Sequence, residues 1–172
     1  MYKILTILLM LMLTATAQDK NKISIDGKSG KPMLVGLCDR QAFVDTNFAW
    51  WFNSGYKYYS PKASVVTMLN EVKTDYTIKI IMGTWCSDSR REVPRFYKLL
   101  DELKLVDEEI TLINVDRMRE VPEINMDDLN ILLVPTFIIY RGGKEIGRIV
   151  ETPIETLEKD LLNILSNSIV EK

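Results

Sequence analysis

The chain of 172 residues is long enough for one domain with a sizeable core, and a composition of 47% hydrophobic and 27% charged residues excludes a disordered protein. A formal net charge of −2 gives no electrostatic reason to expect nucleic acid or an anionic membrane as a partner. The chain contains no histidine, which excludes His-dependent catalytic triads and His-containing metal sites and leaves cysteine and carboxylates as candidate catalytic groups.

The first 17 residues have the pattern of a secretory signal peptide. Lys3 is their only charge, residues 4–13 are apolar, and Ala15-Thr16-Ala17 is a small-x-small cleavage site. A membrane anchor is the alternative, but this apolar run is too short for a span, which needs about 20 residues. We therefore expect an exported protein, periplasmic or secreted, without membrane attachment after signal cleavage. Both cysteines lie in the mature part, so export makes their redox state a functional question.

Residues 18–75 are predicted to form a mainly helical N-terminal extension that packs on the domain. Residues 43–59 contain 8 of the 15 aromatic side chains of the chain, either because they pack on the domain or because they form a partner- or ligand-binding surface. The predicted elements are a loop or short hairpin at 19–30, a short strand or buried segment at 33–38, a helix at about 40–53 capped by Asp39, and a helix that begins at Ser60-Pro61 and ends near 73.

The next stretch joins a buried strand to an amphipathic helix. Residues 77–82 are β-branched and apolar, and after Cys86 apolar residues recur at helical spacing. Cys86 is thus placed at a helix N-terminus, where unpaired N–H groups and the helix dipole favour an anion. A thiol in such a place has a pKa that falls from about 8.5 into a range of roughly 3.5 to 7.5. The alternative is an unreactive, half-buried cysteine kept by packing.

The rest of the chain predicts a parallel βαβ half followed by an antiparallel hairpin half, which together form a three-layer α/β/α arrangement with a central mixed sheet. The predicted elements are a strand at 110–116, an irregular crossover at 118–129, an apolar run at 131–134 that leads to Pro135, strands at 136–140 and 145–150 around a Gly142-Gly143 turn, and a last helix that begins at Thr152-Pro153 with an apolar stripe of Ile154, Leu157, Leu161, Leu162 and Leu165.

With Trp85-Cys86-x-x-Ser89 at a strand-to-helix junction, this order of elements resembles the thioredoxin fold. Pro94 lies eight residues after Cys86, where thioredoxins carry the proline that kinks the active-site helix. Val134-Pro135-Thr136 matches the Ile/Val-Pro-Thr segment whose cis proline faces the active cysteine. The resemblance covers about residues 76–165, so we expect a thioredoxin-like domain at 76–172 behind the unmatched extension.

The resemblance implies a thiol–disulfide exchange site built from a small set of residues, with no cofactor and no metal. It implies that Cys86 is the nucleophile and that the cis Pro135 shapes a peptide groove beside it. The implied catalytic positions are Cys86, Ser89, Trp85 and Pro135, and the implied groove positions are Thr84, Val134, Ser87 and Asp88.

Two departures from the family pattern concern the site chemistry. Ser89 stands where the family has its second cysteine, and a hydroxyl does not resolve a mixed disulfide, although it can donate a hydrogen bond to the thiolate and keep its pKa low. Ile80 stands where thioredoxins place a buried acid, so no carboxylate assists proton transfer from there. Asp88 is expected to raise the pKa of the thiol if it is near, whereas Arg90 and Arg91 act in the opposite direction.

Three interpretations of Cys38 remain open from the sequence. It is a small buried apolar residue, or it pairs with Cys86 as a structural disulfide or a resolving thiol, or it is an exposed free thiol. A disulfide requires the two Cα atoms to lie within about 7 Å of each other.

Two functions from different classes follow. The first is an exported monothiol oxidoreductase, which acts on protein disulfides or low-molecular-weight thiols through Cys86 and depends on an external reductant. The second is a redox-inactive thioredoxin-fold module that binds extended polypeptide. A metal or iron–sulfur site is disfavoured because one cysteine in the motif and no histidine supply too few ligands.

Overall fold

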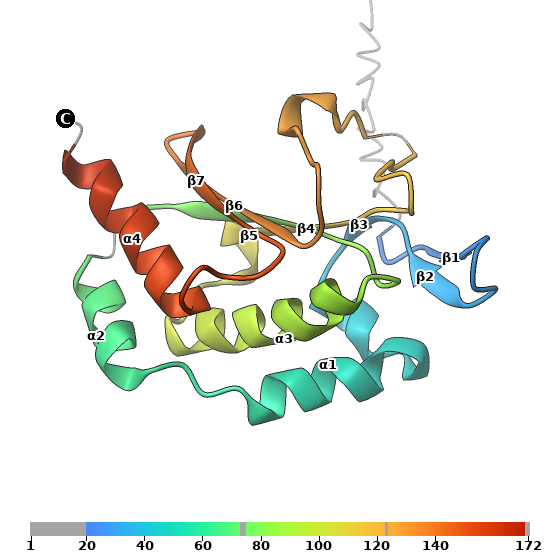
Figure 1. Cartoon of the computed structure of the whole chain (residues 1–172), viewed down its shortest axis with the longest axis horizontal. Coiled ribbons are helices and arrows are strands. Elements are labelled where there is room, and N and C mark those ends of the chain that lie inside the picture. Colours follow the sequence, from blue (N-terminus) through green and yellow to red (C-terminus); the bar gives the residue numbers. More distant parts are fainter. Residues whose placement is uncertain (1–19, 73–74, 123, 171–172) are drawn as a thin grey trace, which may run out of the picture.

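The computed structural model describes residues 20–72, 75–122 and 124–170, and the predicted signal peptide at 1–17 lies outside the described residues. The described part is built on a five-stranded mixed sheet with the strand order β3-β5-β4-β6-β7 (Figure 1). The strands of this sheet are β3 (Gly36–Cys38), β4 (Thr77–Met82), β5 (Ile110–Asn114), β6 (Thr136–Arg141) and β7 (Lys144–Val150).

The apolar strand β4 lies at the centre, parallel to β5 and antiparallel to β6. β6 and β7 form the predicted hairpin, in which Gly142 and Gly143 have φ values of +57° and +79°, a region that glycine enters without steric cost. β3 pairs antiparallel with β5. Before it, β1 (Ile23–Ile25) and β2 (Pro32–Leu34) form a separate hairpin. The N-terminal extension therefore supplies an edge strand of the central sheet as well as helices.

Four α-helices gather on one face of the sheet (Figure 1). Their apolar stripes form one core with alternate strand residues such as Ile80 and Phe137, both fully buried. The stripe predicted for the helix after Cys86 is confirmed, because its apolar residues from Val93 to Leu103 all lie in this core. The helices are α1 (Thr46–Tyr58), α2 (Ala63–Glu71), α3 (Ser87–Glu102) and α4 (Leu157–Val170).

The opposite face of the sheet is covered by the crossover from β5 to β6 (Figure 1). In this crossover only a short 3₁₀ turn, Asp127–Leu129, is helical among the described residues. Val121 and Val134 pack there against Ile113 and Ile138 to make a second, smaller core. The third layer of this α/β fold is therefore an irregular segment, and it lies on the side of the sheet away from the helices.

α1 approaches α3 closely at Pro94. A Cβ atom on Gly55 of α1 would lie 2.5 Å from Cγ of Pro94 in α3, so only glycine fits between the two helices there. Pro94 lacks the N–H that would bond to the carbonyl of Arg90, so α3 lacks one hydrogen bond of its ladder at this point.

Packing accounts for most of the aromatic stretch at 43–59. Phe43, Phe48, Trp51 and Phe52 are buried in the helix-side core, where the rings of Phe43 and Phe52 stack with centroids 4.4 Å apart. Trp50 and Tyr58 instead remain exposed on α1. The packing interpretation is therefore confirmed for the buried rings.

Two helix starts differ from the prediction because side chains outside the helix hold the backbone. The helix expected at Ser60-Pro61 begins at Ala63, since the N–H of Lys62 donates to the carboxylate of Glu158 at 3.1 Å. The last helix begins at Leu157, not at Thr152-Pro153, because the Asp160 carboxylate accepts hydrogen bonds from the N–H groups of Ile154 and Glu155. Ile154 is consequently 96% exposed and does not belong to the apolar stripe.

The helix expected at 40–53 is divided into two parts. Asp39 caps it as predicted, but its first turn is a 3₁₀ helix, Arg40–Val44. Asp45 then begins α1, because its carboxylate accepts a hydrogen bond from the N–H of Asn47.

Candidate functional site

Cys86 lies at the junction of β4 and α3, as the sequence predicts. A turn closed by the Cys86 N–H and the Gly83 carbonyl, 2.9 Å apart, follows the last residue of β4. Cys86 is then the N-cap residue of the 16-residue helix α3, and it is half-buried. A residue in this position adjoins the first helical turn, whose unpaired N–H groups attract an anion.

The segment before β6 faces this sulfur. The Val134–Pro135 peptide bond is cis, as the resemblance implied. The thiol of Cys86 donates a hydrogen bond to the Val134 carbonyl at an S···O distance of 3.2 Å. The segment is held from both sides, since Thr136 Oγ1 donates to the Leu133 carbonyl at 2.7 Å and the Glu151 N–H donates to the Pro135 carbonyl at 2.7 Å. The thiol and the cis proline are therefore brought together by β4 and β6, neighbouring strands of the sheet.

Two of the predicted site residues are buried under the junction. Ser89 is fully buried, and its hydroxyl oxygen accepts a hydrogen bond from the Gly83 N–H at 3.3 Å. No hydrogen bond joins Ser89 to the Cys86 sulfur in the described part of the chain, so the expected contact between them is corrected. Thr84 is 1% exposed and accepts a hydrogen bond from the Leu34 N–H at 3.1 Å. Its side chain ties β2 to the site and does not line a groove.

The two groove positions on the first turn of α3 lie nearer the solvent. Ser87 is exposed, and Asp88 forms an ion pair with Arg91 at 2.8 Å. Arg90 turns back under the turn, where its Nε donates to the Thr84 carbonyl. The opposing charges that the sequence places around Cys86 are therefore largely engaged with other groups.

Trp85 is fixed on several sides. Its indole Nε1 donates to the Val115 carbonyl at 2.9 Å, and a Cβ atom on Gly83 would lie 2.5 Å from the ring. The guanidinium carbon of Arg117 lies 5.0 Å from the ring centroid, in a cation–π contact. Arg117 in turn makes two hydrogen bonds of 2.7 Å to the carboxylate of Asp26. Neither charged residue was predicted, because they lie 91 positions apart and no local pattern connects them.

Cys38 does not reach the site. It is buried in β3 within the helix-side core, whereas Cys86 packs against the smaller core on the opposite face of the sheet. Both cysteines are free thiols. The interpretation of Cys38 as a small buried residue is confirmed, and the alternatives of an exposed thiol and of a disulfide partner for Cys86 are wrong for this structure.

Cys38 is expected to be unreactive in the folded protein. Burial raises the pKa of its thiol to about 11, so the native state keeps its proton at pH values where the unfolded chain loses it. The native state then binds more protons than the unfolded state above the usual thiol pKa, and its contribution to stability declines as the pH rises towards 11. In a Cys86→Ala background, alkylation should label Cys38 only after unfolding. The denaturation midpoint should also fall more steeply between pH 9 and 11 than in a Cys38→Val control, which carries the same tyrosines.

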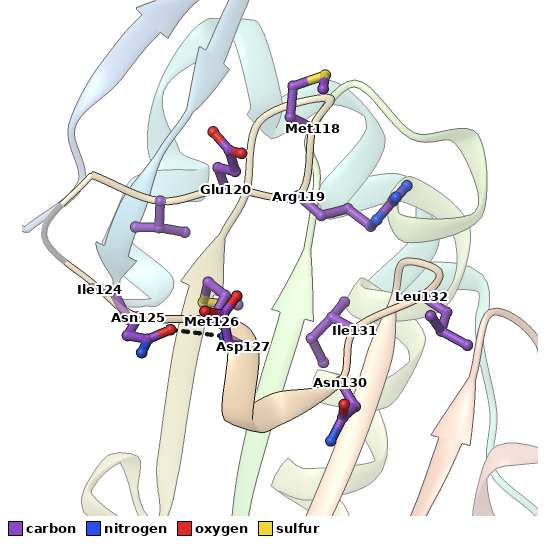
Figure 2. Close-up of a pocket in the computed structure, with 11 residues that line it drawn as sticks. Met118, Arg119, Glu120, Ile124, Asn125, Met126, Asp127, Asn130, Ile131 and Leu132 are labelled. Atoms are coloured by element: carbon purple, nitrogen blue, oxygen red, sulfur yellow. Dashed lines mark hydrogen bonds between the residues drawn. The ribbon is translucent and has the colours of Figure 1, made fainter.

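A hollow of about 490 Å³ lies in the crossover from β5 to β6 (Figure 2). Four of its lining residues belong to the same apolar cluster as Trp85 and Cys86, and the rest of its wall consists of charged and amide side chains together with Met118 and Leu132. The cluster members are Val121, Ile124, Met126 and Ile131, and the polar members are Arg119, Glu120, Asn125, Asp127 and Asn130.

The described residues contain no group of three or more His, Cys, Asp or Glu side chains placed to hold a metal ion. In the same part of the chain, no helix has both the length and the apolar character needed to cross a membrane.

Comparison with known proteins finds relatives by sequence and similar folds among solved structures. No protein-family model matches the chain. Thioredoxin H2 of Arabidopsis thaliana is 28% identical over 92 residues, which cover 52% of this chain and 65% of that protein. Thioredoxin H2-1 of Oryza sativa subsp. japonica is 29% identical over 86 residues, or 50% of this chain and 58% of the relative. The chain thus spans less than two thirds of the length of these relatives.

Among solved structures, a Pseudomonas aeruginosa protein of unknown function superposes with a TM-score of 0.58 at 14% identity, over 76% of this chain and 92% of that chain. At this identity the superposition concerns the fold alone, and it extends beyond the half of the chain that the sequence relatives match.

Proposed function

We propose that this chain, a member of the thioredoxin-like superfamily, is a thiol–disulfide oxidoreductase that acts through Cys86 alone. The observation that carries the proposal is the half-buried thiol at the N-terminus of α3, 3.2 Å from the carbonyl of Val134 and beside the cis peptide bond to Pro135. A packing cysteine needs neither a helix N-terminus nor a partner segment held from both sides.

The exchange proceeds in three displacements. The thiolate of Cys86 attacks one sulfur of a substrate disulfide, so that a new S–S bond forms while the other substrate sulfur leaves as a thiolate and takes a proton from water. An external thiolate then attacks the mixed disulfide at the substrate sulfur or at Cys86. A second external thiolate attacks the sulfur of the first one in the mixed disulfide so formed, and the substrate sulfur or Cys86 leaves as a thiolate. The substrate disulfide is then reduced, Cys86 is regenerated, and the two external thiols have become one disulfide.

An external thiol is required because this chain supplies no second one to the site. Ser89 carries a hydroxyl where a resolving sulfur would stand, and Cys38 lies on the other face of the sheet. The chain is therefore suited to hold a mixed disulfide until a reductant from outside arrives. Protein disulfides and low-molecular-weight thiols are the partners that we propose.

The backbone beside the sulfur suits an extended peptide substrate. No hydrogen-bond partner is found for the N–H of Val134 among the described residues, and Pro135 has no N–H to compete with it. A peptide strand that pairs with Val134 places its own disulfide next to Cys86. Leu132 and Leu133, which are 78% and 45% exposed, offer apolar contacts just before this position.

The exported location remains part of the proposal. The pattern of residues 1–17 supports it, and a chain that begins at Gln18 when isolated from its host would agree with it.

The experiment that tests the proposal traps the mixed disulfide. The Cys38→Ala variant, incubated with oxidised glutathione or with a short disulfide-linked peptide, should gain one adduct per chain at Cys86, detected by mass spectrometry. The adduct should persist until an external thiol is added. The Cys86→Ala variant is the matched control and should form none. Peptide binding without any adduct would contradict the oxidoreductase and favour a redox-inactive polypeptide-binding module.

A further inference from the structure

The hairpin of β1 and β2, which precedes the central sheet, contains a buried carboxylate. Asp26 is 1% exposed and lies in the turn between the two strands. Its backbone closes that turn, since its N–H donates to Lys31 and its carbonyl accepts from Gly30. Its carboxylate also accepts from the Lys28 N–H at 3.1 Å and from the Ser29 hydroxyl. The position of this carboxylate is therefore set by its own turn.

Arg117 is anchored by this carboxylate. Its Nε and Nη2 each lie 2.7 Å from one of the two Asp26 oxygens, which is the bidentate geometry that a guanidinium provides and an ammonium does not. The guanidinium holds the pKa of the Asp26 carboxyl well below its usual range, and the carboxylate raises the pKa of Arg117. The pair is thus charged on both sides throughout the physiological pH range.

The other face of the guanidinium meets the redox site. It lies over the ring of Trp85, the residue before Cys86, and a negative charge on Cys86 would raise the pKa of Arg117 further. The nearby ions on α3 are engaged elsewhere, because Asp88 pairs with Arg91 and Arg90 donates to the Thr84 carbonyl. Arg117 therefore presents a fixed positive charge on the crossover side of the thiol.

We infer that Asp26 and Arg117 are positioning residues of the Cys86 site: the N-terminal hairpin holds the Arg117 cation against Trp85, where it fixes the indole and attracts anions to the sulfur. The inference concerns the reacting group of the proposed function, yet the reaction of Cys86 with a simple alkylating reagent measures it without any turnover. The hairpin is then a working part of the site and not only an addition to the fold.

The test compares two reagents on one thiol. In a Cys38→Ala background, the rate constants of Cys86 with iodoacetate and with iodoacetamide are measured at the same pH and low ionic strength. Both rates depend equally on the thiolate fraction, so their ratio reports the local charge that the anionic reagent meets. Arg117→Gln should lower the ratio by about threefold, as expected for one unit charge near the sulfur. Arg117→Lys should recover part of it.

Arg119→Gln is the matched control, because it removes the same charge from the same crossover. Arg119 is exposed, lines the hollow of Figure 2, and has no ion pair in the described part of the structure. The ratio should stay unchanged in this variant. An unchanged ratio in Arg117→Gln, or an equal fall in both variants, would overturn the inference, whether or not the mixed disulfide forms.

The Asp26→Asn variant shows whether Asp26 positions Arg117 or only neutralises its charge, because the two roles change the ratio of the rate constants in opposite directions. If Asp26 only compensated the charge of Arg117, its neutralisation would raise the ratio. If it holds the guanidinium over Trp85, the ratio should fall towards the Arg117→Gln value, because the freed side chain moves into solvent. A rise or no change would overturn the role of Asp26. Circular dichroism confirms that each variant is folded, and the Arg117 variants keep the inference testable if Asp26→Asn does not fold.

Discussion

Replacing Ser89 with cysteine (Ser89→Cys) is expected to convert the site from one thiol to two and to release the substrate without an external reductant. Position 89 lies on the first turn of α3, three residues after Cys86, and residues at this spacing are neighbours on a helix surface. The separation fits the Cα distance of a disulfide. A sulfur there can attack the mixed disulfide at Cys86 and expel the substrate.

The expected gain is large because the attack becomes intramolecular. Loss of the Cys86 adduct in Ser89→Cys should be at least about 100-fold faster than in the parent chain with millimolar external thiol, as effective molarities of positioned groups suggest. The adduct lifetime is followed by mass spectrometry in the Cys38→Ala background. Ser87→Cys is the control, because its exposed side chain adds the same thiol on the same turn but does not face Cys86. Equal lifetimes in Ser89→Cys and the parent would contradict the geometry.

Adding a single methyl group at Gly83 (Gly83→Ala) is expected to damage both stability and the site. The new Cβ would lie 2.5 Å from Cε2 and 2.6 Å from Nε1 of Trp85. The indole does not yield easily, since it is bonded to the Val115 carbonyl and covered by Arg117. The free energy of unfolding should therefore fall by about 1–3 kcal/mol, the usual cost of overpacking.

Urea denaturation measures this loss, and the rate of Cys86 adduct formation measures the displacement of the adjacent ring. Gly27→Ala is the matched control: a Cβ atom at Gly27 meets nothing within 4 Å, and the position lies in the turn next to Asp26. It should leave both quantities within experimental error. If Gly83→Ala were as stable as this control, the packing described around Trp85 would be wrong.

The sequence was most informative where one segment carries a complete local pattern. The buried run of β4, the helical spacing that begins at Val93, and the paired glycines before β7 each specify their element without help from distant residues. The meeting of Cys86 and Pro135 was implied by the resemblance of their two motifs to those of thioredoxins, and the antiparallel pairing of β4 with β6 places both positions at one edge of the sheet.

Prediction from the sequence failed where a residue far away in the chain determines the local structure. The starts of α2 and α4 are set by the carboxylates of Glu158 and Asp160, which accept hydrogen bonds from N–H groups of the preceding backbone. Thr84 has the polarity of a groove residue, but its hydroxyl oxygen is buried and accepts a hydrogen bond from the Leu34 N–H. All four helices pack on the same face of the sheet. An amphipathic stripe shows that a helix packs on a sheet, but it does not show on which face.

The attachment of the N-terminal extension has a consequence for the order of folding. Its side-chain hydrogen bonds to the rest of the chain span long stretches of sequence, from 45 residues between Tyr56 and Asp101 to 99 between Tyr59 and Glu158. β3 forms its antiparallel hydrogen bonds with β5, so it joins the sheet only when β5 has formed. Loop-closure entropy opposes such contacts until the intervening chain has condensed, which slows folding. The N-terminal extension is therefore expected to be secured late in folding, and until then β5 presents an open edge on which a second unfolded chain can pair.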